Sequence, residues 1–74
     1  MSQKGNADIR RITALLEEMK PGELFILKTL KDRYYDKYGS YYMPVSGRFG
    51  QLLRRIPLCQ VHKEQRGGHI WRRV

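Results

Sequence analysis

This sequence has one cysteine, no long apolar run and almost no acidic residues in its second half. Because Cys59 has no partner for an internal disulfide, the fold must depend on packing, and we expect its thiol to be buried. No stretch approaches the roughly 18 apolar residues that a membrane span needs. The first six residues lack the apolar core of a signal peptide. We therefore expect a soluble cytoplasmic protein, nuclear if its source is eukaryotic, with no membrane partner.

Residue groups typical of catalysis or metal binding are also missing. Cys59, His62 and His69 are possible metal ligands. Cys59 and His62 lie three positions apart on an expected strand, however, so they should face opposite sides, and no fourth ligand of the usual zinc set is evident. No serine–histidine–acid pattern or phosphate-binding glycine loop occurs. A chain of 74 residues can bury only one thin core, which leaves little room for a catalytic cleft. We expect no enzyme activity, no metal and no cofactor.

Positive charge is abundant, and it is unevenly distributed. Fifteen lysines and arginines against seven acids give a net charge of +8. Up to Met43 the balance is +2, whereas the remaining residues hold seven basic side chains and only Glu64, for +6. A merely solubilising charge would not explain this segregation. Six of the seven basic residues are arginines, whose planar guanidinium suits phosphate and guanine, so a polyanionic partner is expected.

The first half of the chain predicts a helix, a short strand and a second helix. Residues 1–6 are interpreted as a flexible lead. The first helix should cover about residues 7–19, capped by Asn6 or Asp8, with an apolar stripe at helical spacing: Ile9, Ile12, Leu15, Leu16 and Met19. An apolar run at 24–27 predicts a strand, and 28–38 predicts a helix that ends at Gly39 in a left-handed conformation.

Five tyrosines lie between residues 34 and 42. Tyr34 and Tyr38 share a helix face and should pack in the core with their hydroxyls reaching water. Some of Tyr35, Tyr41 and Tyr42 are expected to stay exposed, where they can touch a phosphate or a partner.

A third helix is predicted over residues 44–56, with Pro44 in its first turn and Pro57 ending it. Its expected core arc consists of Val45, Phe49, Leu52, Leu53 and Ile56. The opposite face contains Gly47, Gln51 and Arg54, with Arg48 and Arg55 at its borders, and has no acid.

The C-terminal residues predict a β-hairpin. Strands are expected at 58–63 and 69–74, joined by a turn at 64–68 in which Gly67 and Gly68 allow positive φ. Alternation leaves open whether Ile70 or Trp71 faces the core. We favour Trp71, because a small core gains much from one large aromatic ring.

This order of elements predicts an α+β fold, and over residues 7–74 it resembles the winged-helix (winged helix-turn-helix) family of nucleic-acid-binding domains. The resemblance implies three helices with a short strand and a C-terminal two-stranded hairpin, the wing. It further implies that helix 44–56 enters the major groove of DNA and that the wing reaches the minor groove or backbone. In one respect the chain departs from the family, since the link at 39–43 is longer than a tight helix-turn-helix turn.

By position, the resemblance implies that the nucleic-acid-binding residues are Gly47, Arg48, Gln51, Arg54 and Arg55 on the helix, and Lys63, Gln65, Arg66 and His69 on the wing. Gln51 and Arg54 are expected to read bases, because glutamine pairs with adenine and arginine with guanine. Arg48, Arg55, Lys63 and Arg66 are expected to contact phosphates or the minor groove.

The sequence thus favours a double-stranded DNA-binding protein, most naturally a small transcriptional regulator. Two alternatives stay open: a winged-helix protein-interaction module of a larger assembly, and an RNA-binding domain in which exposed tyrosines or Trp71 stack on bases. A homodimer through the first helix or the tyrosine segment is also considered.

Overall fold

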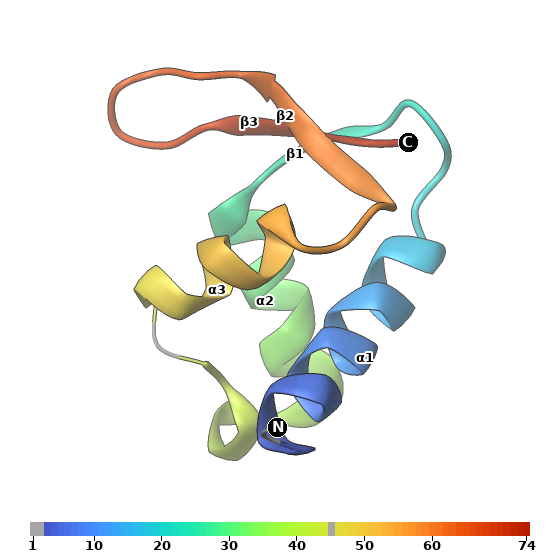
Figure 1. Ribbon diagram of the computed structural model, residues 1–74, viewed down its shortest axis with the longest axis vertical. Helices are drawn as coiled ribbons and strands as arrows, with labels where there is room; N and C mark the ends of the chain where they lie inside the picture. Colours follow the sequence, from blue (N-terminus) through green and yellow to red (C-terminus); the bar gives the residue numbers. More distant parts are fainter. Residues whose placement is uncertain (1–2, 45) are drawn as a thin grey trace.

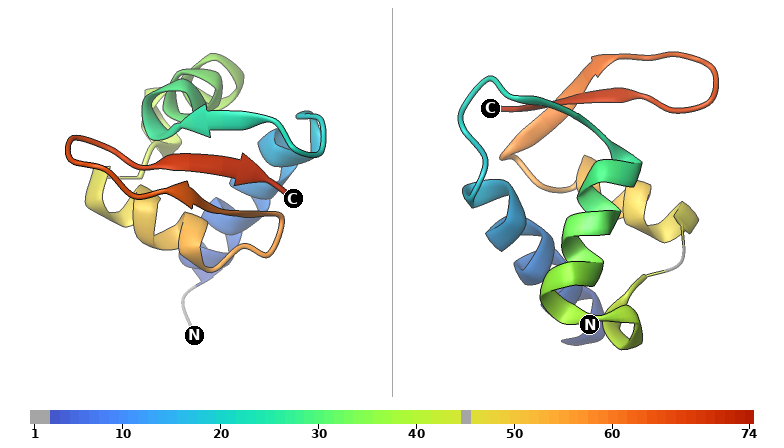
Figure 2. Two further views of the ribbon diagram at one scale, coloured as in Figure 1. Left: turned by 90° about the horizontal axis from the view of Figure 1, so that it is seen from above. Right: turned by 180° about the vertical axis from the view of Figure 1, so that it is seen from behind.

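The computed structural model describes residues 3–44 and 46–74 and has an α+β fold, with three α-helices on one side of a three-stranded antiparallel sheet (Figures 1 and 2). The elements are α1 (Gln3–Glu17), β1 (Leu24–Ile26), α2 (Leu27–Tyr38), the 3-10 helix η1 (Ser40–Tyr42), α3 (Ser46–Arg54), β2 (Cys59–Lys63) and β3 (Ile70–Arg73). This order confirms the predicted fold class and is compatible with a winged-helix topology. Among the described helices, none combines the length and apolar character needed to cross a bilayer.

The sheet joins the short strand to the C-terminal hairpin. Its order is β1-β3-β2, so β3 is central and pairs antiparallel with both neighbours. Trp71 lies between Phe25 of β1 and Val61 of β2 in this register. Phe25 and Trp71 are both buried, so Trp71 faces the helices, as the sequence favoured. The strand at 24–26 therefore completes the sheet that supports the hairpin.

The apolar stripes predicted for the helices form one core. On α1 its buried members are Ile12, Leu15 and Leu16, followed by Met19 just beyond the helix. Phe49, Leu52, Leu53 and Ile56 supply the contribution of α3 and the residues after it, as predicted, whereas Val45 lies outside the described residues. Because one arc of α3 is fully used in packing, its opposite arc must face solvent.

Tyr34 lies at the centre of this core. Its side chain has no exposed surface, and its ring centroid lies 5.7 Å from that of Phe49 in an edge-to-face arrangement. Its hydroxyl donates a hydrogen bond to the carbonyl oxygen of Tyr42, at 3.0 Å. Burial raises the pKa of Tyr34 above its usual value of 10.0, so the hydroxyl keeps its proton for this bond. Tyr34 therefore links α2 to both η1 and α3.

Several predicted boundaries were wrong. Helix α1 begins at Gln3, four residues before the predicted start, so Asn6 and Asp8 lie inside the helix and cannot cap it. Helix α3 begins only at Ser46, which leaves Pro44 outside its first turn. Gly39 has the expected positive φ of 81°, but its ψ of 172° is extended, because the chain continues into η1 instead of making a tight turn.

The Tyr34→Phe variant tests the link to η1. It keeps the ring in the core but removes the hydrogen bond to the Tyr42 carbonyl, so we expect the free energy of unfolding to fall by about 1 kcal/mol. Tyr38→Phe is the control, since its hydroxyl makes only a 3.5 Å contact with the Arg11 carbonyl. Urea denaturation measures both variants, and equal losses would contradict the special role of Tyr34.

Cys59 is buried, as predicted, and its thiol lies 3.5 Å from the Leu53 carbonyl oxygen. Burial raises its pKa from 9.0 to about 11. Below pH 9 the thiol is protonated in both folded and unfolded chains. As the pH rises from 9 towards 11, only the unfolded chain loses this proton readily, so stability falls by an amount that approaches about 3 kcal/mol.

Comparison with the Cys59→Ala variant separates the loss of stability caused by ionisation of the Cys59 thiol from effects of the titration of lysines and tyrosines. We expect the stability difference between the wild-type chain and the variant to shrink as the pH rises through this window. Denaturant titrations at a series of pH values measure it, and a difference that stays constant would refute the assignment.

Candidate nucleic-acid interface

The solvent-facing side of α3 carries the residues that the sequence nominated. Gly47, Arg48, Gln51 and Arg54 are exposed, and so is Arg55 directly after the helix. Among the described residues, apart from the neighbours of Gly47 and the backbone of its own helix, no atom lies within 4 Å of a Cβ placed on Gly47, so the helix can be approached closely at this position. Helix α3 is thus a surface helix with one polar, acid-free side.

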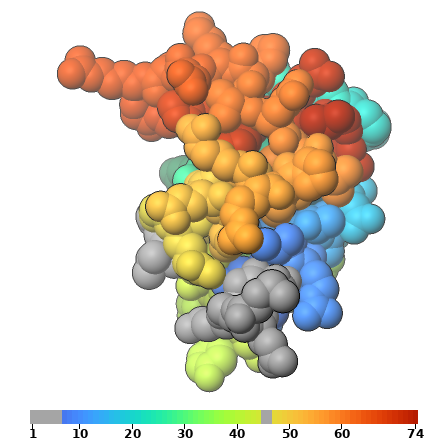
Figure 3. Space-filling model, viewed as in Figure 1, coloured from blue at the N-terminus to red at the C-terminus, as the bar shows by residue number. Residues whose placement is uncertain are grey.

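The wing projects beside the beginning of α3. Lys63, Gln65 and Arg66 are exposed at and near its tip, and Gly67 and Gly68 turn the chain with φ of 87° and 143°. In every view the tip and the N-terminal end of α3 point to the same side of the molecule (Figures 1 and 2). The space-filling view shows hairpin atoms directly above those of α3 (Figure 3). The two nominated elements therefore share one side.

His69 differs from the other nominated wing residues. It is half-buried at the base of the wing, where its Nδ1 is hidden from solvent and has no hydrogen-bond partner among the described residues. Only part of its imidazole is therefore open to a ligand.

Arg54 and Arg48 both contact other elements. The Arg54 guanidinium carbon lies 5.8 Å from the centroid of the Trp71 ring, which ties the end of α3 to the sheet. Nε of Arg48 lies 4.0 Å from Oδ2 of the buried Asp8, whose Oδ1 accepts a hydrogen bond from Arg11 at 3.1 Å. Asp8 thereby connects α1 to α3, a role that local sequence could not indicate because the two contacting residues are 40 positions apart.

Two arginines of the basic C-terminal half do not join this surface. Arg73 turns to the helices and donates from Nε to the Leu16 carbonyl at 2.7 Å. Arg72 lies on the other face of β3, opposite Leu24 and Gln60, with its Nε buried and unpaired among the described residues. The sequence therefore overestimates the number of basic residues in the interface. Of the seven after Met43, five are exposed: Arg48, Arg54, Arg55, Lys63 and Arg66.

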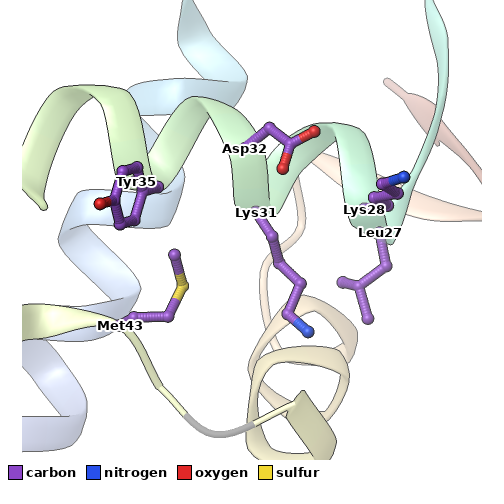
Figure 4. A pocket seen from close by; sticks show the side chains of 6 residues that line it. All are labelled: Leu27, Lys28, Lys31, Asp32, Tyr35 and Met43. Carbon is purple, nitrogen blue, oxygen red and sulfur yellow. The ribbon is translucent and has the colours of Figure 1, made fainter. Parts of the chain in front are cut away.

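A groove between α2 and Met43 adds two lysines that the sequence did not single out (Figure 4). It has a volume of about 490 Å³ and is lined by Leu27, Lys28, Lys31, Asp32, Tyr35 and Met43. Leu27 and Lys31 point from α2 towards α3 in this view. The charge balance of the sequence did not indicate these lysines, because the first half of the chain has a net charge of only +2. Folding brings Lys31 towards α3 (Figure 4).

The three residues considered for zinc binding do not form a cluster. Cys59 is buried on the core face of β2, whereas His62 is exposed on its other face. Across the described residues, no group of three or more histidine, cysteine or acidic side chains is placed to hold a metal ion.

Comparison with known proteins adds no assignment to this surface. No protein-family model, curated protein or solved structure matched the chain. The ligand of this surface must therefore be inferred from its own charge, shape and exposure.

Proposed function

We propose that the chain binds double-stranded DNA, with α3 in the major groove and the wing on the adjacent minor groove or backbone, and that it acts as a small transcriptional regulator. The observation that carries this proposal is the solvent-facing side of α3, which is basic and free of acids and lies beside a basic wing tip on the same side. Polyanions are the natural ligands of such a surface.

The dimensions and side chains of α3 support this mode of binding. A major groove about 12 Å wide admits one helix, and base edges there present distinct patterns of donors and acceptors. Gln51 is exposed near the middle of α3, and Arg54 is positioned by its contact with Trp71. We propose these two as base readers, and Gly47 as the point of closest approach.

Phosphate contacts would come from both sides of α3. Arg48 and Arg55 border the helix, while Lys63 and Arg66 extend from the wing. Lys28 on α2 adds a positive charge at the groove beside the start of α3. Such contacts hold a protein in register on the duplex but do not read its sequence.

Salt-dependent binding tests the proposal. We expect duplex affinity, measured by fluorescence anisotropy, to fall steeply with salt, because each neutralised phosphate releases counterions. Arg66→Ala should reduce the salt slope by about 1 and weaken binding to all duplexes alike. Lys20→Ala is the matched control. It removes one charge from the segment between α1 and β1, which lies opposite the wing tip (Figure 2). Loss of duplex binding in both variants, or in neither, would refute the wing assignment.

Base reading needs a separate test, made on the duplex recovered by selection from a randomised pool. Gln51→Ala should weaken binding to this duplex by about 1–3 kcal/mol, roughly 5- to 150-fold, and leave binding to a scrambled duplex unchanged. Equal losses on both duplexes would rule out base reading by Gln51. No duplex binding at low salt would overturn the proposed function as a whole.

One observation favours protein docking as a second candidate function. On the sheet face that points away from the helices, Leu24 and Ile26 remain 49% and 44% exposed, beside Ile70 of β3. Exposed apolar side chains gathered on one face are typical of protein-binding surfaces. A chain that fails to bind duplex DNA but forms a complex lost in Ile26→Lys would support this candidate.

A further inference from the structure

Two tyrosines of η1 are exposed in a way that duplex binding by α3 and the wing does not explain. Tyr41 is 89% exposed, and its ring centroid lies 5.0 Å from that of Tyr42 at an interplanar angle of 87°. An aromatic side chain contributes the most favourable free energy when its ring is buried against another surface. The Tyr41–Tyr42 pair is therefore a candidate contact surface.

The backbone of η1 and the Tyr42 ring are held in place by contacts with other elements of the protein. The Tyr34 hydroxyl bonds to the Tyr42 carbonyl at 3.0 Å, and the Met43 amide donates to the Ser40 carbonyl at 3.1 Å. On the other side, the Arg11 guanidinium carbon lies 4.3 Å from the centroid of the Tyr42 ring. A ligand would thus meet a Tyr42 ring and an η1 backbone that are already ordered, which lowers the entropic cost of binding.

A cavity adjoins these rings. It has a volume of about 480 Å³ and is lined by Ala7, Asp8, Arg11, Tyr41 and Tyr42. The one acid in its wall, Asp8, is already engaged by Arg11 and lies 4.0 Å from Arg48 of α3. The described lining therefore holds one positive and one negative charge, and the contact between Asp8 and Arg48 places the cavity beside α3.

We propose that this tyrosine site, defined by Arg11, Tyr41 and Tyr42, stacks an unpaired nucleobase, so that the preferred ligand is a DNA duplex with a short single-stranded extension. The inference rests on the proposed duplex binding and names its substrate class more closely. Along the long axis of the molecule α3 lies between the hairpin and η1 (Figures 1 and 3). A duplex held by α3 and the wing would therefore direct one end towards the tyrosine site.

The chemistry of the site fits a nucleotide better than a peptide. Every base offers a π-face to an aromatic ring, and arginine adds a cation–π contribution and a phosphate partner. Proline-rich peptides also bind aromatic grooves. They carry no negative charge, however, to match the net charge of +8 on this chain.

The test compares a labelled blunt duplex with the same duplex carrying two unpaired nucleotides at its 3′ or 5′ end. Fluorescence anisotropy should show about 5- to 150-fold tighter binding for one of the extended duplexes, which corresponds to the 1–3 kcal/mol that stacking of a base on an aromatic side chain contributes. Tyr41→Ala should abolish this gain and leave the affinity for the blunt duplex unchanged. Tyr41→Phe should retain the gain, because stacking needs the ring and not the hydroxyl.

Tyr35→Ala is the control for losing an exposed tyrosine outside the site, and it should keep the ratio between extended and blunt duplexes. Because Tyr41 is almost fully exposed, its variants should unfold at the wild-type urea concentration, and this measurement confirms that they fold.

The outcomes separate this inference from the proposed function. If the blunt duplex binds but extensions bring no gain, or if Tyr41→Ala keeps the gain, the inference is overturned while duplex binding stands. If the blunt duplex does not bind but a single-stranded oligonucleotide does so through Tyr41, duplex binding fails and base stacking stands. A proline-rich peptide that binds through Tyr41, with no gain from extensions, would assign the site to peptides and overturn the inference.

Discussion

The edge-to-face packing of Tyr34 against Phe49 is the contact on which the arrangement of this surface depends. Tyr34 belongs to α2 and Phe49 to α3, and neither side chain has any exposed surface. Fixing Phe49 sets the rotation of α3 about its axis, which decides that Arg48 and Gln51 face solvent. The same tyrosine holds η1 through its hydroxyl. One buried side chain thus orients both the basic helix and the exposed aromatic pair.

Arginine performs two different tasks in this small protein. Arg73 and Arg11 hold the fold together, one by a hydrogen bond to the Leu16 carbonyl and the other by contacts with Asp8 and the Tyr42 ring. Arg66 and Arg55, in contrast, extend from the surface with their charge available to a ligand. A guanidinium serves both purposes because it combines several donors with a planar face that packs on aromatic rings. Net charge alone therefore describes such an interface incompletely.

The basic helix, the wing and the tyrosine site together outline an elongated surface on one molecule. Charge attracts a polyanion at long range and depends on salt, whereas aromatic stacking acts only on contact and depends little on salt. A ligand that satisfies both must carry phosphates and at least one accessible base. A duplex that ends in unpaired nucleotides has both properties, which is why the two proposals belong to one mode of binding.

The sequence by itself determined the α+β class and the exposed side of α3, because hydrophobic periodicity reports directly which face of an element is buried. For Trp71 periodicity left two faces open, and only the size of its ring favoured the core. The sequence also indicated that Tyr34 is core and that some later tyrosines are exposed. Only the tertiary structure decided the contact of Asp8 with Arg48, the positions of Arg72 and Arg73 away from the interface, and the cavity at η1. These features join residues far apart in the chain, and no local pattern encodes which distant side chain a charged group will meet.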